Sequence, residues 1–155
     1  MTRDEILAMK PSREFDAQVA GKAMGWSDPI EVSMARSLKS AEKWFTAYKH
    51  APAEQRLSIG LSYKSTHVTR DGTKLYCGRP FDAYSPKPYS TSIAAAHKAE
   101  ERIKEIGKAD AYTVELFFVV MVADNPRKEL RTQFDLIHAS PEQRTKAALL
   151  AVMEI

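Results

Sequence analysis

The sequence predicts an α+β domain, an antiparallel sheet with helices on both faces (an α-β-α sandwich). Several segments repeat apolar residues at spacings of three and four, which is typical of amphipathic helices. Other segments alternate apolar and polar residues, which is typical of strands. From Leu116 to Ala123 both faces of the expected strand are apolar, so this strand is predicted to be central. An antiparallel sheet with helices on both faces is the arrangement that best buries the apolar faces of these elements.

Two short helices are expected at the N-terminus. Thr2 and Glu5 have the spacing of a capping box, and Pro11 ends the turn that follows. Ser12 is placed to cap a second helix, in which apolar residues recur at a spacing of four. Gly25 follows where a left-handed helix end is favoured.

The stretch 27–58 is expected to form an amphipathic helix. Asp28-Pro29 has the pattern of a cap followed by a first-turn proline. The apolar stripe at spacings of three and four is Met34, Leu38, Ala41, Phe45 and Tyr48. We interpret residues 27–62 as a helical insertion within a single domain that spans residues 1–155.

A hairpin and an irregular stretch follow. Residues 61–69 alternate as a strand does, and the pair 71–72, Asp-Gly, is a strong turn signal because both residues tolerate positive φ. Residues 73–77 return as the second strand. Glycine and proline recur in the stretch 78–88, so no regular element is expected there.

The second half of the chain is predicted to contain a helix, two strands and a terminal helix. The serine- and threonine-rich start at 90 opens a helix over 90–106, and Gly107 closes it. Residues 112–123 form the central strand, and 130–138 form its antiparallel partner. The segment 140–143, Ser-Pro-Glu-Gln, combines a cap, a first-turn proline and a capping box at the start of the last helix.

Composition excludes several classes of protein. A chain of 155 residues with 44% hydrophobic and 28% charged positions suits one domain whose core needs no disulfide bonds or metal ions for its stability. The lone Cys77 excludes a disulfide framework and a cysteine-based zinc site. The longest apolar run is far shorter than the roughly 20 residues of a membrane span. Because the N-terminus lacks the apolar core of a signal peptide, we expect a soluble intracellular protein without a membrane partner.

Charge and aromatic residues gather in the segment 63–89. This segment carries five basic and two acidic residues, so it accounts for the whole net charge of +3. It also holds five of the fourteen aromatic residues. Such an excess suits a small anion better than a long nucleic acid, because basic nucleic-acid footprints usually raise the pI above about 9. A solvated loop with ordinary lysines is the alternative interpretation.

The same segment is the predicted ligand-binding site. Aromatic faces stack on nucleobases with about 1–3 kcal/mol per base, and guanidinium and ammonium groups bind phosphate. The capped helix start beside it also favours an anion. The predicted site residues are Lys74, Tyr76, Arg79, Phe81, Tyr84, Lys87, Tyr89, Ser90 and Thr91. In the alternative interpretation, at least two of the aromatic rings only pack the loop onto the sheet.

No motif in the sequence indicates a catalytic activity. Cys77 has no catalytic signature around it, and the glycines do not form a phosphate loop. The spacings of the four histidines match no common metal motif, so neither a cofactor nor a metal is expected. A zinc site of His67, His138 and a carboxylate stays open as an alternative. His97 is interpreted as a half-buried packing residue of its helix.

Three blocks resemble a known family. Residues 3–11 with 19–26, residues 88–96, and residues 139–142 with 144–151 are similar, in this order, to the phage ABA-sandwich domain family, small proteins of bacteriophages and prophages. The resemblance implies α–β–α layering and action inside an infected bacterial cell. It transfers no site residues, because the family has no general activity. The chain departs from the family in its longer stretch 27–62 and in His97, where relatives tend to carry a large aromatic.

Together these observations favour a phage-encoded binding protein and not an enzyme. We expect it to sequester a small anionic nucleotide-type immune signal in the cytoplasm of the infected host, against anti-phage defence. One alternative is a protein-interaction module that uses 28–58 to inhibit a host or phage enzyme. Another is a nucleotide hydrolase that uses His67 or His138. A homo-oligomer through the hairpin edge or through the stripe in 27–58 is also compatible with the sequence.

Overall fold

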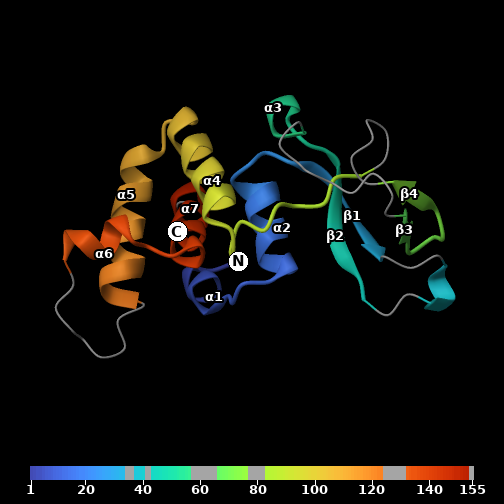
Figure 1. The fold of residues 1–155 in the computed structure, drawn as a ribbon, viewed down its shortest axis with the longest axis horizontal. Coiled ribbons are helices and arrows are strands. Elements are labelled where there is room, and N and C mark those ends of the chain that lie inside the picture. The colour runs from blue at the N-terminus through green and yellow to red at the C-terminus, as the bar shows by residue number, and fades with distance from the viewer. Residues whose placement is uncertain (34–36, 41–42, 57–65, 77–82, 124–131, 154–155) are drawn as a thin grey trace. The chain divides into compact units, whose positions relative to one another are not determined.

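The computed structural model describes residues 1–33, 37–40, 43–56, 66–76, 83–123 and 132–153. The chain forms two compact units, shown in Figure 1. Met1–Met24 and Pro88–Ile155 make up a helical unit, and Gly25–Lys87 make up a sheet unit. The fold is α+β with an antiparallel sheet, as the sequence predicts. None of the described helices is long and apolar enough to cross a membrane.

The two N-terminal helices are confirmed. Helix α1 (Arg3–Ala8) begins at a reciprocal capping box, in which the Glu5 amide donates to the Thr2 hydroxyl at 3.2 Å and the Thr2 amide donates to the Glu5 carboxylate at 2.6 Å. Helix α2 (Arg13–Lys22) is capped by Ser12, whose hydroxyl accepts from the Phe15 amide at 3.1 Å. Gly25 has φ 73°, as expected for the residue that turns the chain after a helix.

Helix α7 (Pro141–Met153) begins where the sequence predicts, and helix α4 (Ile93–Glu105) begins three residues after the predicted start at 90, with Ser92 as its cap. At the start of α7 the Ser140 amide donates to the Gln143 side chain at 2.8 Å, and the Gln143 amide donates to the Ser140 hydroxyl at 3.2 Å. Helix α7 is buried from Arg144 to Ala151 and packs against α1, α2, α4 and α5. It is therefore the centre of the helical unit.

The predicted central strand 112–123 is wrong. The segment forms helix α5 (Ala109–Phe118), which continues into a π-helical turn, η2 (Val119–Ala123). Its residues are apolar in almost every direction, so periodicity cannot separate a strand from a helix there. The helical form is joined to α1 by a two-point ion pair, in which Arg3 donates to both carboxylate oxygens of Glu115 at 3.0 and 2.5 Å.

The predicted partner strand 130–138 is also wrong in its described part. Helix α6 (Gln133–Ile137) occupies it, while residues 130 and 131 lie outside the described residues. The Thr132 amide donates to the Asp135 carboxylate at 2.6 Å. The spacing of Thr132 and Asp135 is that of a helix-capping pair, which the strand interpretation overlooked.

The sheet unit has the strand order β2-β1-β3-β4, and all neighbouring strands are antiparallel. The strands are β1 (Ser27–Ser33), β2 (Phe45–His50), β3 (Thr66–Thr69) and β4 (Lys74–Tyr76). The core is formed by the buried Val32, Ala47 and Ala83, and against it pack Ile30, Phe45 and Leu75. Strands β3 and β4 confirm the predicted hairpin over 66–76, whereas residues 61–65 and 77 of the prediction lie outside the described residues. Gly72 in its turn has φ 90°.

The predicted helix over 27–58 is wrong, and with it the helical insertion 27–62. The stretch contains β1, β2, a short 3-10 turn η1 (Leu38–Ser40) and one helical turn α3 (Ala53–Arg56); residues 57–62 lie outside the described residues. Of the residues in the apparent helical stripe, Phe45 and Tyr48 lie on β2 and Leu38 lies in η1, whereas Met34 and Ala41 lie outside the described residues. Pro29 is tolerated because β1 pairs with β3 only at Val32 and Ser33, so its missing N–H interrupts no ladder on that side. The amphipathic helix proposed as an interaction surface is therefore not present among the described residues.

Candidate ligand-binding site

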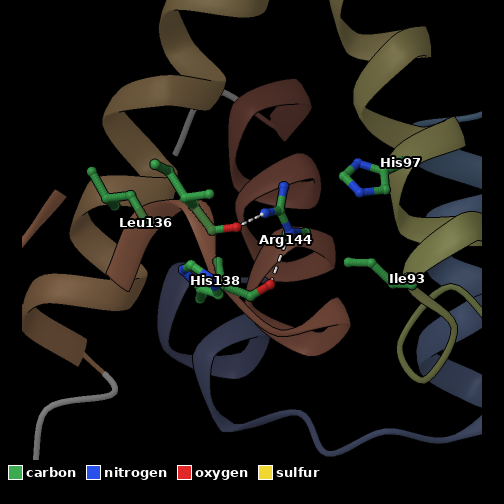
Figure 2. A pocket seen from close by; sticks show the side chains of 7 residues that line it. Ile93, His97, Leu136, His138 and Arg144 are labelled. Carbon is green, nitrogen blue, oxygen red and sulfur yellow. Dashed lines mark hydrogen bonds between the residues drawn. The ribbon is translucent and has the colours of Figure 1, made fainter. Parts of the chain in front are cut away.

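A depression of about 670 Å³ opens on the helical unit where α4, α6 and α7 meet (Figure 2). It is lined by Ile93, His97, Leu136, Ile137, His138, Ala139 and Arg144. Three of these residues are large aliphatic side chains, two carry imidazoles and one carries a guanidinium group. The depression thus combines an apolar wall with nitrogen-bearing polar groups.

Arg144 is held rigidly at this depression by the first turn of α7. Its side chain is only 10% exposed. Nε donates to the carbonyl of Ala139 at 2.9 Å and Nη2 donates to the carbonyl of Ile137 at 2.7 Å, as the dashed lines in Figure 2 mark. The last carbonyl groups of a helix such as α6 have no hydrogen-bond donor within the helix, and Arg144 donates to them instead. The guanidinium group is therefore preorganised by the fold.

Glu100 of α4 balances the charge of Arg144. Its carboxylate accepts from Arg144 Nη1 at 2.5 Å and also from the hydroxyl of Tyr112. Burial alone would raise the pKa of Glu100, but hydrogen bonds from Tyr112, Arg144 and His97 outweigh burial and lower it. Burial and the neighbouring Glu100 raise the pKa of the Tyr112 hydroxyl. Glu100 is therefore an ionised acceptor at neutral pH.

The environment of His97 determines which ring nitrogen carries the proton. Its Nδ1 lies 2.7 Å from Oε2 of Glu100. Because an ionised carboxylate only accepts hydrogen bonds, Nδ1 must carry the hydrogen. In the neutral ring Nε2 is then an acceptor, and it becomes a donor only when the ring gains a second proton. Within the described part of the chain, Nε2 of His97 has no hydrogen-bond partner.

His138, in the turn after α6, is held in the same tautomer. Its Nδ1 donates to the carbonyl of Phe134 at 2.8 Å, and its ring stacks on the Phe134 ring with centroids 3.8 Å apart. Figure 2 shows the two imidazoles reaching the depression from α4 and from the end of α6. In both rings Nε2 is therefore the nitrogen that has no hydrogen-bond partner among the described residues, and it can donate to an anion only in a doubly protonated ring.

The residues predicted as a binding site fall in both units. In the sheet unit Lys74 is exposed, Lys87 is half-buried and Tyr84 is buried. In the helical unit Thr91 is exposed, whereas Tyr89 and Ser90 are buried. Arg79, Phe81 and the side chain of Tyr76 lie outside the described residues.

Two of the predicted stacking rings serve in packing. Tyr84 is 2% exposed, pairs with the backbone of Tyr48, and meets the ring of Trp26 edge-on at 6.5 Å. Tyr89 is fully buried, and its carbonyl accepts from the Thr145 hydroxyl at 2.9 Å. Neither ring leaves a face exposed for a base, which agrees with the packing interpretation that the sequence left open.

Sequence reasoning missed the depression itself. The sequence indicates a half-buried packing residue at His97, and its side chain is indeed 51% exposed, but it lines the depression and is hydrogen-bonded to Glu100. The sequence did indicate the pairing of His97 with Glu100, because residues three positions apart lie on the same side of a helix. Arg144 gave no such signal, because its partners lie on α4 and at the end of α6.

The metal-site alternative gains no support from the described residues. His67 is buried in the sheet unit, edge-on to Phe45, whereas His138 belongs to the helical unit. Across the described ranges, no group of three or more His, Cys, Asp or Glu side chains is placed to hold a metal ion. Cys77 lies outside the described residues.

Comparisons with protein-family models, curated proteins and solved structures find no match to this chain.

Proposed function

We propose that this protein binds a small anionic, nucleotide-type ligand in the depression of the helical unit and holds it without converting it. The observation that carries the proposal is that one fixed guanidinium group and two imidazoles line a single depression with aliphatic walls. The anionic group of the ligand lies near Arg144, His97 and His138. The ring-bearing part of the ligand lies against Ile93 and Leu136.

Preorganisation supports binding at this position. Arg144 donates to three protein acceptors, which fixes its geometry before a ligand arrives. A group that is already fixed loses little conformational entropy on binding. A guanidinium has five N–H donors, so N–H groups of Arg144 remain for an anion after these three hydrogen bonds.

The attraction for an anion is proposed to come mainly from the histidines. Glu100 neutralises Arg144, and the pair has no net charge. Protonation of His97 and His138 adds positive charge and converts both Nε2 atoms from acceptors into donors.

The biological setting is proposed from the sequence. The resemblance of three separated blocks to phage ABA-sandwich proteins supports a phage origin and a place in the cytoplasm of the infected bacterial host. A nucleotide made there by an immune system has the anionic group and the ring that the depression suits. Holding such a signal out of circulation would counter anti-phage defence.

Calorimetry with a panel of cyclic dinucleotides and ADP-ribose-type nucleotides tests the proposal. We expect at least one ligand to bind more tightly than about 100 μM. After the protein is denatured, chromatography and mass spectrometry are expected to recover that ligand unchanged. The absence of binding across the panel contradicts the proposal, and a hydrolysed ligand supports the hydrolase alternative instead.

Single substitutions locate the ligand. His97→Ala and His138→Ala are each expected to weaken binding about tenfold or more. Lys98→Ala is the matched control, because Lys98 follows His97 on α4 but pairs with Glu101 and does not line the depression. Lys74→Ala tests the loop that the sequence predicted. If Lys74→Ala abolishes binding while His97→Ala has no effect, the ligand site lies in the sheet unit and the depression is the wrong site.

A further inference from the structure

The ring of His138 is fixed at the depression by two contacts. Its Nδ1 donates to the carbonyl of Phe134 at 2.8 Å, and its imidazole stacks on the Phe134 ring with centroids 3.8 Å apart and an angle of 27° between the ring planes. Both contacts come from one residue of α6, to which His138 is the C-terminal cap. The position and tilt of the imidazole are therefore set before a ligand arrives, which lowers the entropy cost of stacking on it.

One face of this imidazole borders the depression. Phe134 covers the opposite face, and among the described residues it is the ring that stacks on His138. His138 is exposed and lines the depression, whereas Phe134 does not line it. The face that is turned away from Phe134 is therefore the one that a ligand in the depression meets.

An aliphatic side chain lies across the depression from this imidazole. Ile93, the first residue of α4, lines the same depression and is 47% exposed. Figure 2 shows Ile93 and His138 on opposite sides of Arg144. Proteins hold nucleobases between aromatic and apolar side chains, and histidine is one of the rings on which bases stack. The two side chains therefore suit a flat base, with Arg144 near the anionic group of the same ligand.

We propose that the depression is selective for purine nucleotides, with the purine stacked on the face of His138 that is turned away from Phe134. This inference rests on the proposed function and adds to it the position and the class of the base. The anionic group still lies near Arg144 and His97. Stacking on one aromatic side chain raises affinity about tenfold or more. A purine covers more of the imidazole than a pyrimidine does, and a free phosphate forms no stack.

The test compares ligands of similar charge with and without a base. ADP, UDP and inorganic pyrophosphate are each titrated into the full chain near neutral pH, and calorimetry measures each dissociation constant. We expect ADP to bind at least about tenfold more tightly than pyrophosphate, with UDP between them. In a parallel NMR titration the ring protons of His138 are expected to shift upfield with ADP, because they lie over the base, and not with pyrophosphate.

Two substitutions of His138 separate its ring from its hydrogen bond. His138→Phe keeps a ring that can stack but has no nitrogen, whereas His138→Gln keeps an amide that can donate to an anion but has no ring. The preference for ADP over pyrophosphate is expected to persist in His138→Phe and to fall below about threefold in His138→Gln. A weakening that affects both ligands alike leaves this ratio of affinities unchanged. Lys98→Ala, which does not alter the depression, is the matched control.

Failure of this inference is distinguishable from failure of the proposed function. The stacking on His138 is overturned if ADP and pyrophosphate bind equally, if UDP binds more tightly than ADP, or if the preference for ADP survives in His138→Gln. It is also overturned, without the proposed function, if ADP does not bind while a cyclic dinucleotide or ADP-ribose-type nucleotide binds and loses affinity in His97→Ala. If no nucleotide of either series binds, both proposals are wrong.

Discussion

At the scale of single residues, Asp16 is a buried carboxyl group that accepts a hydrogen bond from a distant part of the chain. It lies on α2 and accepts from the Ser90 amide at 2.7 Å, which ties α2 to the segment that leads into α4. Burial raises the pKa of Asp16, although hydrogen bonds from Ser90 and the backbone of Tyr89 partly offset it. Because the folded-state pKa is raised, its contribution to stability is greatest below about pH 4 and is lost as the pH rises.

Two substitutions separate the charge of Asp16 from its hydrogen bond. Asp16→Asn keeps an acceptor for Ser90 and cannot ionise, so its free energy of unfolding is expected to improve relative to wild type as the pH rises above about 4. Asp16→Ala leaves the buried amide unpaired and is expected to cost about 1–3 kcal/mol. Urea unfolding at several pH values measures both effects. If the Asn variant instead loses stability relative to wild type with rising pH, the ionised carboxylate stabilises the fold.

At the scale of elements, the β3–β4 hairpin depends on its turn. Asp71 accepts from the Thr69 hydroxyl, the larger influence, and from the Thr73 amide at 2.9 Å; together they lower the pKa of Asp71 to about 2. A lowered folded-state pKa stabilises the hairpin above about pH 4, and this contribution is lost as the pH falls toward 2. Hydrogen exchange of the Thr73 amide, corrected for intrinsic rates, is expected to be less protected at pH 2 than at pH 5. Asp71→Asn is the control and is expected to show no such pH dependence.

Local signals in the sequence predicted helix ends better than element types. The caps at Thr2, Ser12 and Ser140 form hydrogen bonds to groups three residues away, so the sequence contains all the information they need. The apolar segments 27–58 and 112–123 each suited two periodicities, and packing against distant residues decided between them. The depression could not be predicted for the same reason, because the hydrogen-bond partners of Arg144 lie on α4 and at the end of α6.

At the scale of the whole molecule, the division into two units predicts that the depression survives without the sheet. Every residue that lines it belongs to the helical unit, whereas residues 25–87 form a unit of their own between Met24 and Pro88. The hydrogen bond from Ser90 to Asp16 joins the two segments of the helical unit near that point. Replacing 25–87 with a flexible Gly/Ser linker of about 10 residues is therefore expected to leave a cooperatively folding helical protein.

The shortened chain is expected to bind the proposed anionic nucleotide within about threefold of the full-length affinity, because no group that is proposed to contact the ligand is removed. Circular dichroism and thermal melting test folding, and calorimetry tests binding, with His97→Ala in the shortened chain as the control. A shortened chain that folds but does not bind places the ligand in the sheet unit. One that fails to fold shows that the helical unit requires the sheet for its stability, which contradicts two independently stable units.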